Sequence, residues 1–216
     1  MIPIENAEAF ARTFSVSHET IEKLRTYERL LLQWQKAVNL VAPSTLPYFW
    51  QRHFADSAQL IGFARKACIW VDLGSGGGFP GLVIAIMIAN QKECAVHLIE
   101  SNSRKCAFLS EVVRQTAAPA YVHNLRVADA ALAGVPRADV VTARALAPLD
   151  KLLELALPFF HVASKGLFLK GREAETEIAD ARRRWAFDIK IHDSLSDEEG
   201  RILEIEKPML RRGGER

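Results

Sequence analysis

The sequence of 216 residues has few cysteines and no long apolar run. Its three cysteines, Cys68, Cys94 and Cys106, form no CxxC pair, so we expect neither a disulfide framework nor a zinc site. We interpret Cys68 and Cys94 as small core residues of apolar strands. The longest unbroken apolar run, residues 82–89, is far shorter than the roughly 20 residues that span a bilayer. A membrane protein is therefore not expected.

The first residues also lack the basic start and apolar segment of a secretory signal peptide, so we expect a cytoplasmic protein. Charge of neither sign prevails, because 28 basic and 26 acidic residues give a net charge of +2. A dedicated DNA-coating protein would be more basic, whereas an enzyme that contacts RNA briefly fits this balance. Hydrophobic residues make up 49% of the chain, which excludes disorder as its main state.

The first part of the chain has the apolar spacing of amphipathic helices. Ser17 stands where it can cap a helix whose apolar residues recur every three or four positions. Pro43 ends this stretch, and a second helix is expected directly after it. We therefore expect residues 1–64 to form a helical cap and residues 65–216 to form the core of the same compact unit.

Beyond residue 65 the pattern changes to short apolar strands that alternate with helices. Strands are expected at residues 68–73, 95–99, 121–125, 138–143, 166–169, 187–194 and 201–206. Such alternation predicts a parallel sheet with helices on both faces, and the polar turn before the last strand predicts an antiparallel hairpin at the end. The expected fold is α/β, with a doubly wound, mostly parallel, seven-stranded Rossmann-like sheet. This is the usual layout of class I methyltransferases that use S-adenosylmethionine.

A glycine-rich turn at residues 72–81 follows the first expected strand. Such a turn lets a ligand approach the backbone at the carboxyl edge of the sheet. Asp72, Gly74 and Gly76 form the acidic GxGxG pattern of methyltransferases. The dinucleotide pattern also matches inside the turn, but when it is aligned to the strand it meets the bulky Phe79. An acidic residue beside the turn also suits a cationic sulfonium better than a pyrophosphate.

Further candidate cofactor residues follow the next two strands. Glu100 ends the second strand, where a carboxylate can accept hydrogen bonds from both hydroxyls of a ribose. After the third strand, Val127 and Ala128 can sandwich an adenine, and Asp129 can accept from its exocyclic amine. The alternative is that Glu100 and Asp129 only cap the helices that follow them.

Two motifs of base-modifying enzymes are absent after the fourth strand. Residues 142–148 contain neither the (D/N)PP(Y/F) motif of exocyclic-amine methylation nor the Pro-Cys nucleophile of pyrimidine C5 enzymes. Their absence favours attack by an available lone pair, which needs alignment more than a base. Arg144 and Lys170, both at strand ends, are candidates for positioning a target base. The alternative for each is an ion pair with an aspartate near these strand ends.

Several short segments, taken together and in order, carry a resemblance to a known family. They lie at residues 39–42, 52–57, 72–81, 98–102, 105–109, 144–149 and 169–171. The chain resembles the RsmG (GidB) family of bacterial methyltransferases, which act on the N7 of a guanine in 16S ribosomal RNA. The resemblance covers most of the chain, and several matching segments are far more specific than any one of them.

The resemblance implies S-adenosylmethionine as the cofactor, with contacts at Gly74, Phe79, Val127, Ala128 and Arg144. It implies 16S rRNA in the small ribosomal subunit as the partner, with a guanine of the decoding-region loop as the target. We expect no binding to DNA or to a membrane, and no metal site. Nothing in the sequence demands more than a monomer.

Two other classes stay open from the residues alone, a nicotinamide-dependent oxidoreductase and a non-catalytic RNA-binding module. The chain lacks the Tyr-x-x-x-Lys pattern of short-chain dehydrogenases, and its intact glycine turn argues against a pocket that has lost cofactor binding.

His53 and Asp56 are one helical turn apart and could pair to fix the cap on the core. The arginines at 182–184 are interpreted as a solvated helix face. The basic tail at residues 211–216 carries no recognisable motif.

Overall fold

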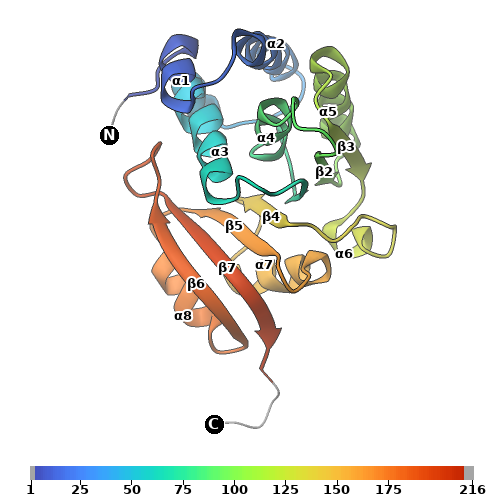
Figure 1. Ribbon diagram of the computed structural model, residues 1–216, viewed down its shortest axis with the longest axis vertical. Helices are drawn as coiled ribbons and strands as arrows, with labels where there is room; N and C mark the ends of the chain where they lie inside the picture. The colour runs from blue at the N-terminus through green and yellow to red at the C-terminus, as the bar shows by residue number, and fades with distance from the viewer. Residues whose placement is uncertain (1–2, 212–216) are drawn as a thin grey trace.

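A computed structural model describes residues 3–211 and shows one seven-stranded sheet covered by helices (Figure 1). The strand order is β3-β2-β1-β4-β5-β7-β6. The strands are β1 (Ile69–Leu73), β2 (Ala95–Glu100), β3 (Ala120–Asn124), β4 (Val140–Arg144), β5 (Lys165–Lys170), β6 (Trp185–Asp193) and β7 (Arg201–Leu210). The first five strands pair in parallel. The expected doubly wound α/β fold is therefore confirmed.

The C-terminal hairpin enters the sheet with β7 between β5 and β6, and both of its pairings are antiparallel. Lys170 at the end of β5 lies opposite Arg201 at the start of β7. This register brings the turn of the hairpin, residues 194–200, to the carboxyl edge of the parallel strands. Ligands bind at that edge in open α/β sheets.

Helices cover the two faces of the sheet. Successive side chains of a strand point to opposite faces, so each strand contributes residues to both cores. Trp70 belongs to the core beneath the N-terminal helices, whereas its neighbour Val71 belongs to the core on the opposite face. The first layer contains α1 (Ala7–Phe14), α2 (His18–Trp34), α3 (Asp56–Ala58), α4 (Gly81–Met87) and α5 (Ser103–Thr116). The second contains α6 (Val127–Ala130), α7 (Leu149–Ala156) and α8 (Ala174–Ala181). In Figure 1, the helices of the first layer gather in the upper half.

The predicted cap of α2 is confirmed, because the Ser17 hydroxyl accepts a hydrogen bond from the Thr20 amide at 3.2 Å. The helix expected after Pro43 is not one regular helix. It is split into a 3₁₀ turn (Pro43–Tyr48), a π turn (Trp50–Ala55), α3 and a second 3₁₀ turn (Gln59–Phe63). Pro47 inside the first turn cannot donate a helical hydrogen bond.

The structure corrects the interpretation of two cysteines. Cys68 and Cys94 stand just before β1 and β2, which pair in parallel, so the two residues face one another with Cα atoms 4.1 Å apart and form a disulfide. The two cysteines are 26 residues apart in the sequence, so the sequence did not reveal that they are close in space. Cys106 is a buried free thiol. Within residues 3–211, no helix has the length and apolar character to cross a membrane.

Candidate functional site

The glycine turn after β1 folds into a tight loop through backbone conformations that glycine adopts without strain. Gly74, Gly76 and Gly78 have φ angles of 67°, 56° and 95°. Any other residue would be strained in this left-handed region. The Ser75 amide donates to the Ile99 carbonyl on β2 at 3.0 Å, which fixes the loop over the sheet edge.

Asp72 lies behind this loop and does not line a cavity. Its carboxylate is fully buried, and it accepts hydrogen bonds from the Thr142 hydroxyl at 2.9 Å and the Gly81 amide at 3.2 Å. Burial raises the pKa of Asp72 to about 6, and its hydrogen bonds and the Arg144 charge offset only part of that rise. The Asp72 side chain therefore points inward and holds the loop from behind, and its expected cofactor contact stays a prediction.

A cavity of about 550 Å³ opens in front of the loop, which is within the range of small-ligand sites. It brings together seven of the sequence-predicted residues from four strand ends: Gly74, Gly76, Phe79, Glu100, Val127, Ala128 and Arg144. We call it the cofactor cavity. Neither Asp129 nor Lys170 is part of its lining.

Both carboxylate oxygens of Glu100 accept hydrogen bonds from backbone amides at the edge of the sheet. One carboxylate oxygen accepts from the Gly76 amide at 2.9 Å, and the other accepts from the Asn102 amide at 2.7 Å. The side chain is thereby fixed at the rim of the cofactor cavity, and its remaining lone pairs are free for a ligand hydroxyl. The helix cap itself comes from Asn102, whose side chain accepts from the amides of Arg104 and Lys105.

A second cavity of about 610 Å³ adjoins the first, and Leu40, Arg144, Ala145 and Leu146 line both. We call it the adjoining cavity. Its lining includes the basic side chains of Arg52, Lys170 and Arg201, together with residues of the cap and of the hairpin turn. Among the described residues, no group of three histidine, cysteine, aspartate or glutamate side chains is arranged to hold a metal ion.

Lys170 lies in the adjoining cavity but is already paired. Its ammonium donates to Glu177 and to the Ala147 carbonyl, both at 2.6 Å. The same Glu177 carboxylate accepts from the Leu149 amide at the start of α7 at 2.7 Å. The ion-pair alternative was therefore right in kind but wrong in its partner, which is a glutamate of α8. Lys170 holds the segment between β4 and α7 that separates the two cavities.

Arg144 is the residue that connects the two cavities with the cap. Its guanidinium lies 5.0 Å from the centre of the Phe79 ring and donates to the Arg52 carbonyl at 3.1 Å and to His53 Nδ1 at 3.0 Å. Asp56 is 3.4 Å away. The expected pairing of His53 with Asp56 is wrong, because the irregular helix turns both side chains toward Arg144. The ion-pair partner of Arg144 is thus a cap residue.

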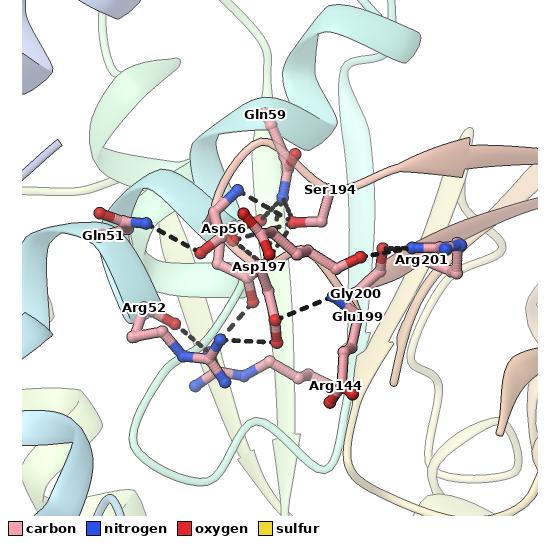
Figure 2. A network of polar contacts seen from close by, with 12 residues as sticks. Gln51, Arg52, Asp56, Gln59, Arg144, Ser194, Asp197, Glu199, Gly200 and Arg201 are labelled. Carbon is pink, nitrogen blue, oxygen red and sulfur yellow. Dashed lines mark hydrogen bonds and ion pairs between the residues drawn. The ribbon is translucent and has the colours of Figure 1, made fainter. Parts of the chain in front are cut away.

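Sequence reasoning missed the contribution of the hairpin turn. Asp56 accepts from the Ser196 hydroxyl at 2.6 Å, Gln59 accepts from the Leu195 amide at 2.8 Å, and Arg52 pairs with Asp197 at 2.6 Å. Figure 2 shows this network, in which cap and hairpin residues meet above Arg144. It closes one wall of the adjoining cavity. Only the polar turn itself was visible as a signal in the sequence.

The model of the family described as rRNA small subunit methyltransferase G (GidB) matches residues 20–204. The chain belongs to this family. A relative with the name Ribosomal RNA small subunit methyltransferase G from Parvibaculum lavamentivorans is 48% identical over 94% of this chain and 89% of its own length. One of the same name from Caulobacter vibrioides is 41% identical over 94% of this chain and 92% of its own.

Solved structures support the same fold at low identity. A substituted MtNAS in complex with S-adenosylmethionine matches with a TM-score of 0.59 and 11% identity, over 94% of this chain and 84% of that one. A putative O-methyltransferase from Klebsiella pneumoniae matches with a TM-score of 0.55 and 11% identity, over 88% and 90%. The fold is that of class I methyltransferases. Family and fold together make this chain a methyltransferase with S-adenosylmethionine as its cofactor.

Proposed function

We propose that this chain methylates the N7 of guanine 527 in 16S rRNA of the small ribosomal subunit. Family membership supports the coarser activity, methylation of small-subunit rRNA. The observation that carries the finer proposal is the pair of cavities with a common wall at Leu40, Arg144, Ala145 and Leu146. A methyl donor in one cavity and a base in the other would meet at this wall.

The residues of the cofactor cavity suit S-adenosylmethionine. Glu100 would accept from the ribose hydroxyls, and Val127 and Ala128 would pack against the adenine. The loop glycines leave room for close approach of the ligand to the backbone. When bound, S-adenosylmethionine supplies an electrophilic methyl group on a sulfonium sulfur.

Guanine N7 is a suitable nucleophile for this site because it carries an in-plane lone pair. That pair forms the new N–C bond while the S–C electrons return to sulfur, so the positive charge passes to the base and no proton has to leave. No general base is therefore required. Orientation of the two groups can account for most of the acceleration, an effect of up to about 7–11 kcal/mol in well-ordered systems.

Basic side chains would orient the guanine without blocking its nucleophile. An arginine that gripped both O6 and N7 would occupy the reacting atom, so we assign Arg144 to O6 or to a phosphate. Lys170 acts indirectly, because its ammonium holds the segment between β4 and α7 in place. The edges of bases are hidden in RNA duplexes, so a loop guanine is the accessible target.

We further propose that the enzyme acts as a cytoplasmic monomer, with residues 1–64 as a cap on the core at 65–216. The cap contributes to substrate binding through Arg52 and Asp56, which line the adjoining cavity. The core holds the cofactor. This division assigns RNA contact mainly to the cap and the hairpin turn.

The test is transfer of labelled methyl groups from S-adenosylmethionine to small ribosomal subunits that lack their native N7 modification. Borohydride–aniline treatment, which cleaves RNA at N7-methylguanine, would map the product. We expect one new cleavage, at guanine 527. Subunits that already carry the modification are the matched control and should accept no label. Label without cleavage would reject N7, and cleavage elsewhere would reject the proposed guanine.

A further inference from the structure

His53 is a buried histidine whose two ring nitrogens are both engaged. It is 5% exposed and lies between the cap and the common wall of the two cavities. Its Nδ1 is 3.0 Å from the Arg144 guanidinium, and its Nε2 is 2.8 Å from the Thr45 hydroxyl. His53 thus connects the cap to Arg144, one of the residues that line both cavities.

The protons of these hydrogen bonds can be assigned from the chemistry of the partners. An arginine guanidinium can only donate, so Nδ1 must present a lone pair to Arg144. The Thr45 hydroxyl donates its one proton to the Ala42 carbonyl at 2.7 Å, so its oxygen must accept from Nε2–H. The two partners independently require the same neutral tautomer of His53.

We propose that His53, as the neutral Nε2–H tautomer, is a positioning residue that aims the Arg144 guanidinium at the common wall of the two cavities. His53 acts through Arg144 and need not touch the substrate. That this positioning of Arg144 serves catalysis rests on the proposed function. In that function, reaction takes place where Arg144 lines both the cofactor cavity and the adjoining cavity.

The surroundings of Arg144 leave it little freedom to turn. The Phe79 ring lies under the guanidinium, and the other three contacts come from the irregular segment at Trp50–Ala55 and the residue directly after it. These contacts are the Arg52 carbonyl, His53 Nδ1 and Asp56. The Phe79 ring also lies 4.8 Å from the His53 ring. A π turn widens the helix locally, and such turns are frequent at functional sites.

Neutrality of His53 is favoured by the same surroundings. Burial, with the positive charges of Arg144 and Arg52, lowers the pKa of His53 to about 3. A protonated ring would direct an N–H at the Arg144 donors and lose this hydrogen bond. During methyl transfer the positive charge passes from the sulfonium to the base, and a neutral His53 adds no further charge beside it.

The first test uses two amide variants of different length. The amide oxygen of His53→Asn can occupy the place of Nδ1 and continue to accept from Arg144. The longer side chain of His53→Gln reaches the place of Nε2 and leaves Arg144 without this acceptor. We expect His53→Gln to lose roughly tenfold or more in kcat/KM for methyl transfer, and His53→Asn to lose several-fold less than His53→Gln. Equal losses in the two variants would overturn the proposal.

The second test reads the tautomer directly, without RNA and without a substitution in the ring. Nitrogen-15 NMR of labelled wild-type enzyme should show His53 protonated at Nε2 alone. Thr45→Val removes the acceptor of Nε2–H, whereas Thr45→Ser keeps it, so only the valine variant should disturb that signal. Protonation at Nδ1 or at both nitrogens in the wild type would overturn the proposal.

Failure of the two proposals would look different. If guanine N7 is the wrong target, wild-type enzyme gives no borohydride–aniline cleavage but the His53 signal still shows the Nε2–H tautomer. If His53 does not position Arg144, the wild type methylates N7 and the two amide variants behave alike. Thermal unfolding of each variant distinguishes a loss of folding from a loss of Arg144 positioning.

Discussion

The cofactor cavity and the adjoining cavity share a wall but are built by different means. The first is formed largely by one glycine loop and neighbouring strand ends, held by backbone hydrogen bonds and a buried carboxylate. The second joins segments as far apart as residues 40 and 201, held by side-chain pairs between the cap, the hairpin turn and α8. The cofactor cavity should therefore be rigid and coupled to global stability. The adjoining cavity should tolerate change at a cost mainly to RNA binding.

The largest effect is expected from Gly81→Ala at the start of α4, which tests whether the cofactor cavity is rigid and coupled to global stability. A Cβ at this position would lie 2.7–2.8 Å from atoms of the buried Asp72 and would collide with Leu98. We expect a loss of about 1–3 kcal/mol in the free energy of unfolding, measured with urea, and weaker binding of S-adenosylmethionine.

Gly62→Ala is the matched control. Gly62 is exposed and helical, and an added Cβ would meet nothing within 4 Å. Its free energy of unfolding should change little or rise. A Gly81→Ala variant as stable as Gly62→Ala would contradict the view of a rigid cofactor cavity.

Asp72→Asn tests the buried carboxylate behind the loop. The folded pKa of about 6 exceeds the ordinary value of 3.8, so the folded state binds the proton more tightly. Its stabilising contribution is present below about pH 4 and is lost as the pH rises through 6. The asparagine variant should exceed the wild type in unfolding free energy by on the order of 2 kcal/mol at pH 7, and by little at pH 4. Urea unfolding from pH 4 to 8 measures this, and a pH-independent difference would contradict it.

Tyr27→Phe probes the contact between α2 and the glycine loop. The buried Tyr27 hydroxyl donates to the Gly77 carbonyl, which is also buried. Its removal leaves that carbonyl without this donor and should cost about 1 kcal/mol of unfolding free energy. Tyr48→Phe, at a side chain that is 65% exposed, is the control and should be neutral. If both variants are neutral, the cap does not support the loop through this bond.

The smallest effect on stability is expected in the adjoining cavity, from Asp197→Asn. Its ion pair with Arg52 is 2.6 Å long but partly exposed, so its loss should cost less than about 1 kcal/mol, and less at high salt. The affinity for S-adenosylmethionine, measured by calorimetry, should stay unchanged while the KM for ribosomal subunits changes.

Asp188→Asn breaks a similar pair with Lys207, on β6 and β7 and outside the lining of the adjoining cavity. It should leave both binding constants at their wild-type values. A change in cofactor affinity in the Asp197 variant would erase the distinction between the two cavities.

The cofactor cavity was largely predictable from the sequence because its parts are local. The glycine turn, Glu100 and the pair at 127–128 each follow a strand, and parallel strands end at one edge. The exception is Asp72, whose place in the motif did not reveal that its side chain points inward. A strand alternates its side chains, and the fold decides which face each one meets.

The adjoining cavity was only partly predictable. Arg144 and Lys170 were found as cations at strand ends, but their partners, Asp56 and Glu177, come from other layers of the fold. Ser196 and Asp197 were seen only as turn residues, and their contact with the cap depends on how β7 enters the sheet. The disulfide of Cys68 and Cys94 was missed for the same reason.

The sequence by itself determined the sheet of alternating strands and helices, the glycine turn and the family. These features follow from periodicity and from motifs of neighbouring residues, which each segment carries with it. Only the tertiary structure decided the tautomer of His53, the partners of Arg144 and the closure of the adjoining cavity. These depend on distances between residues such as 53 and 144, which are fixed only when separate segments pack against one sheet edge.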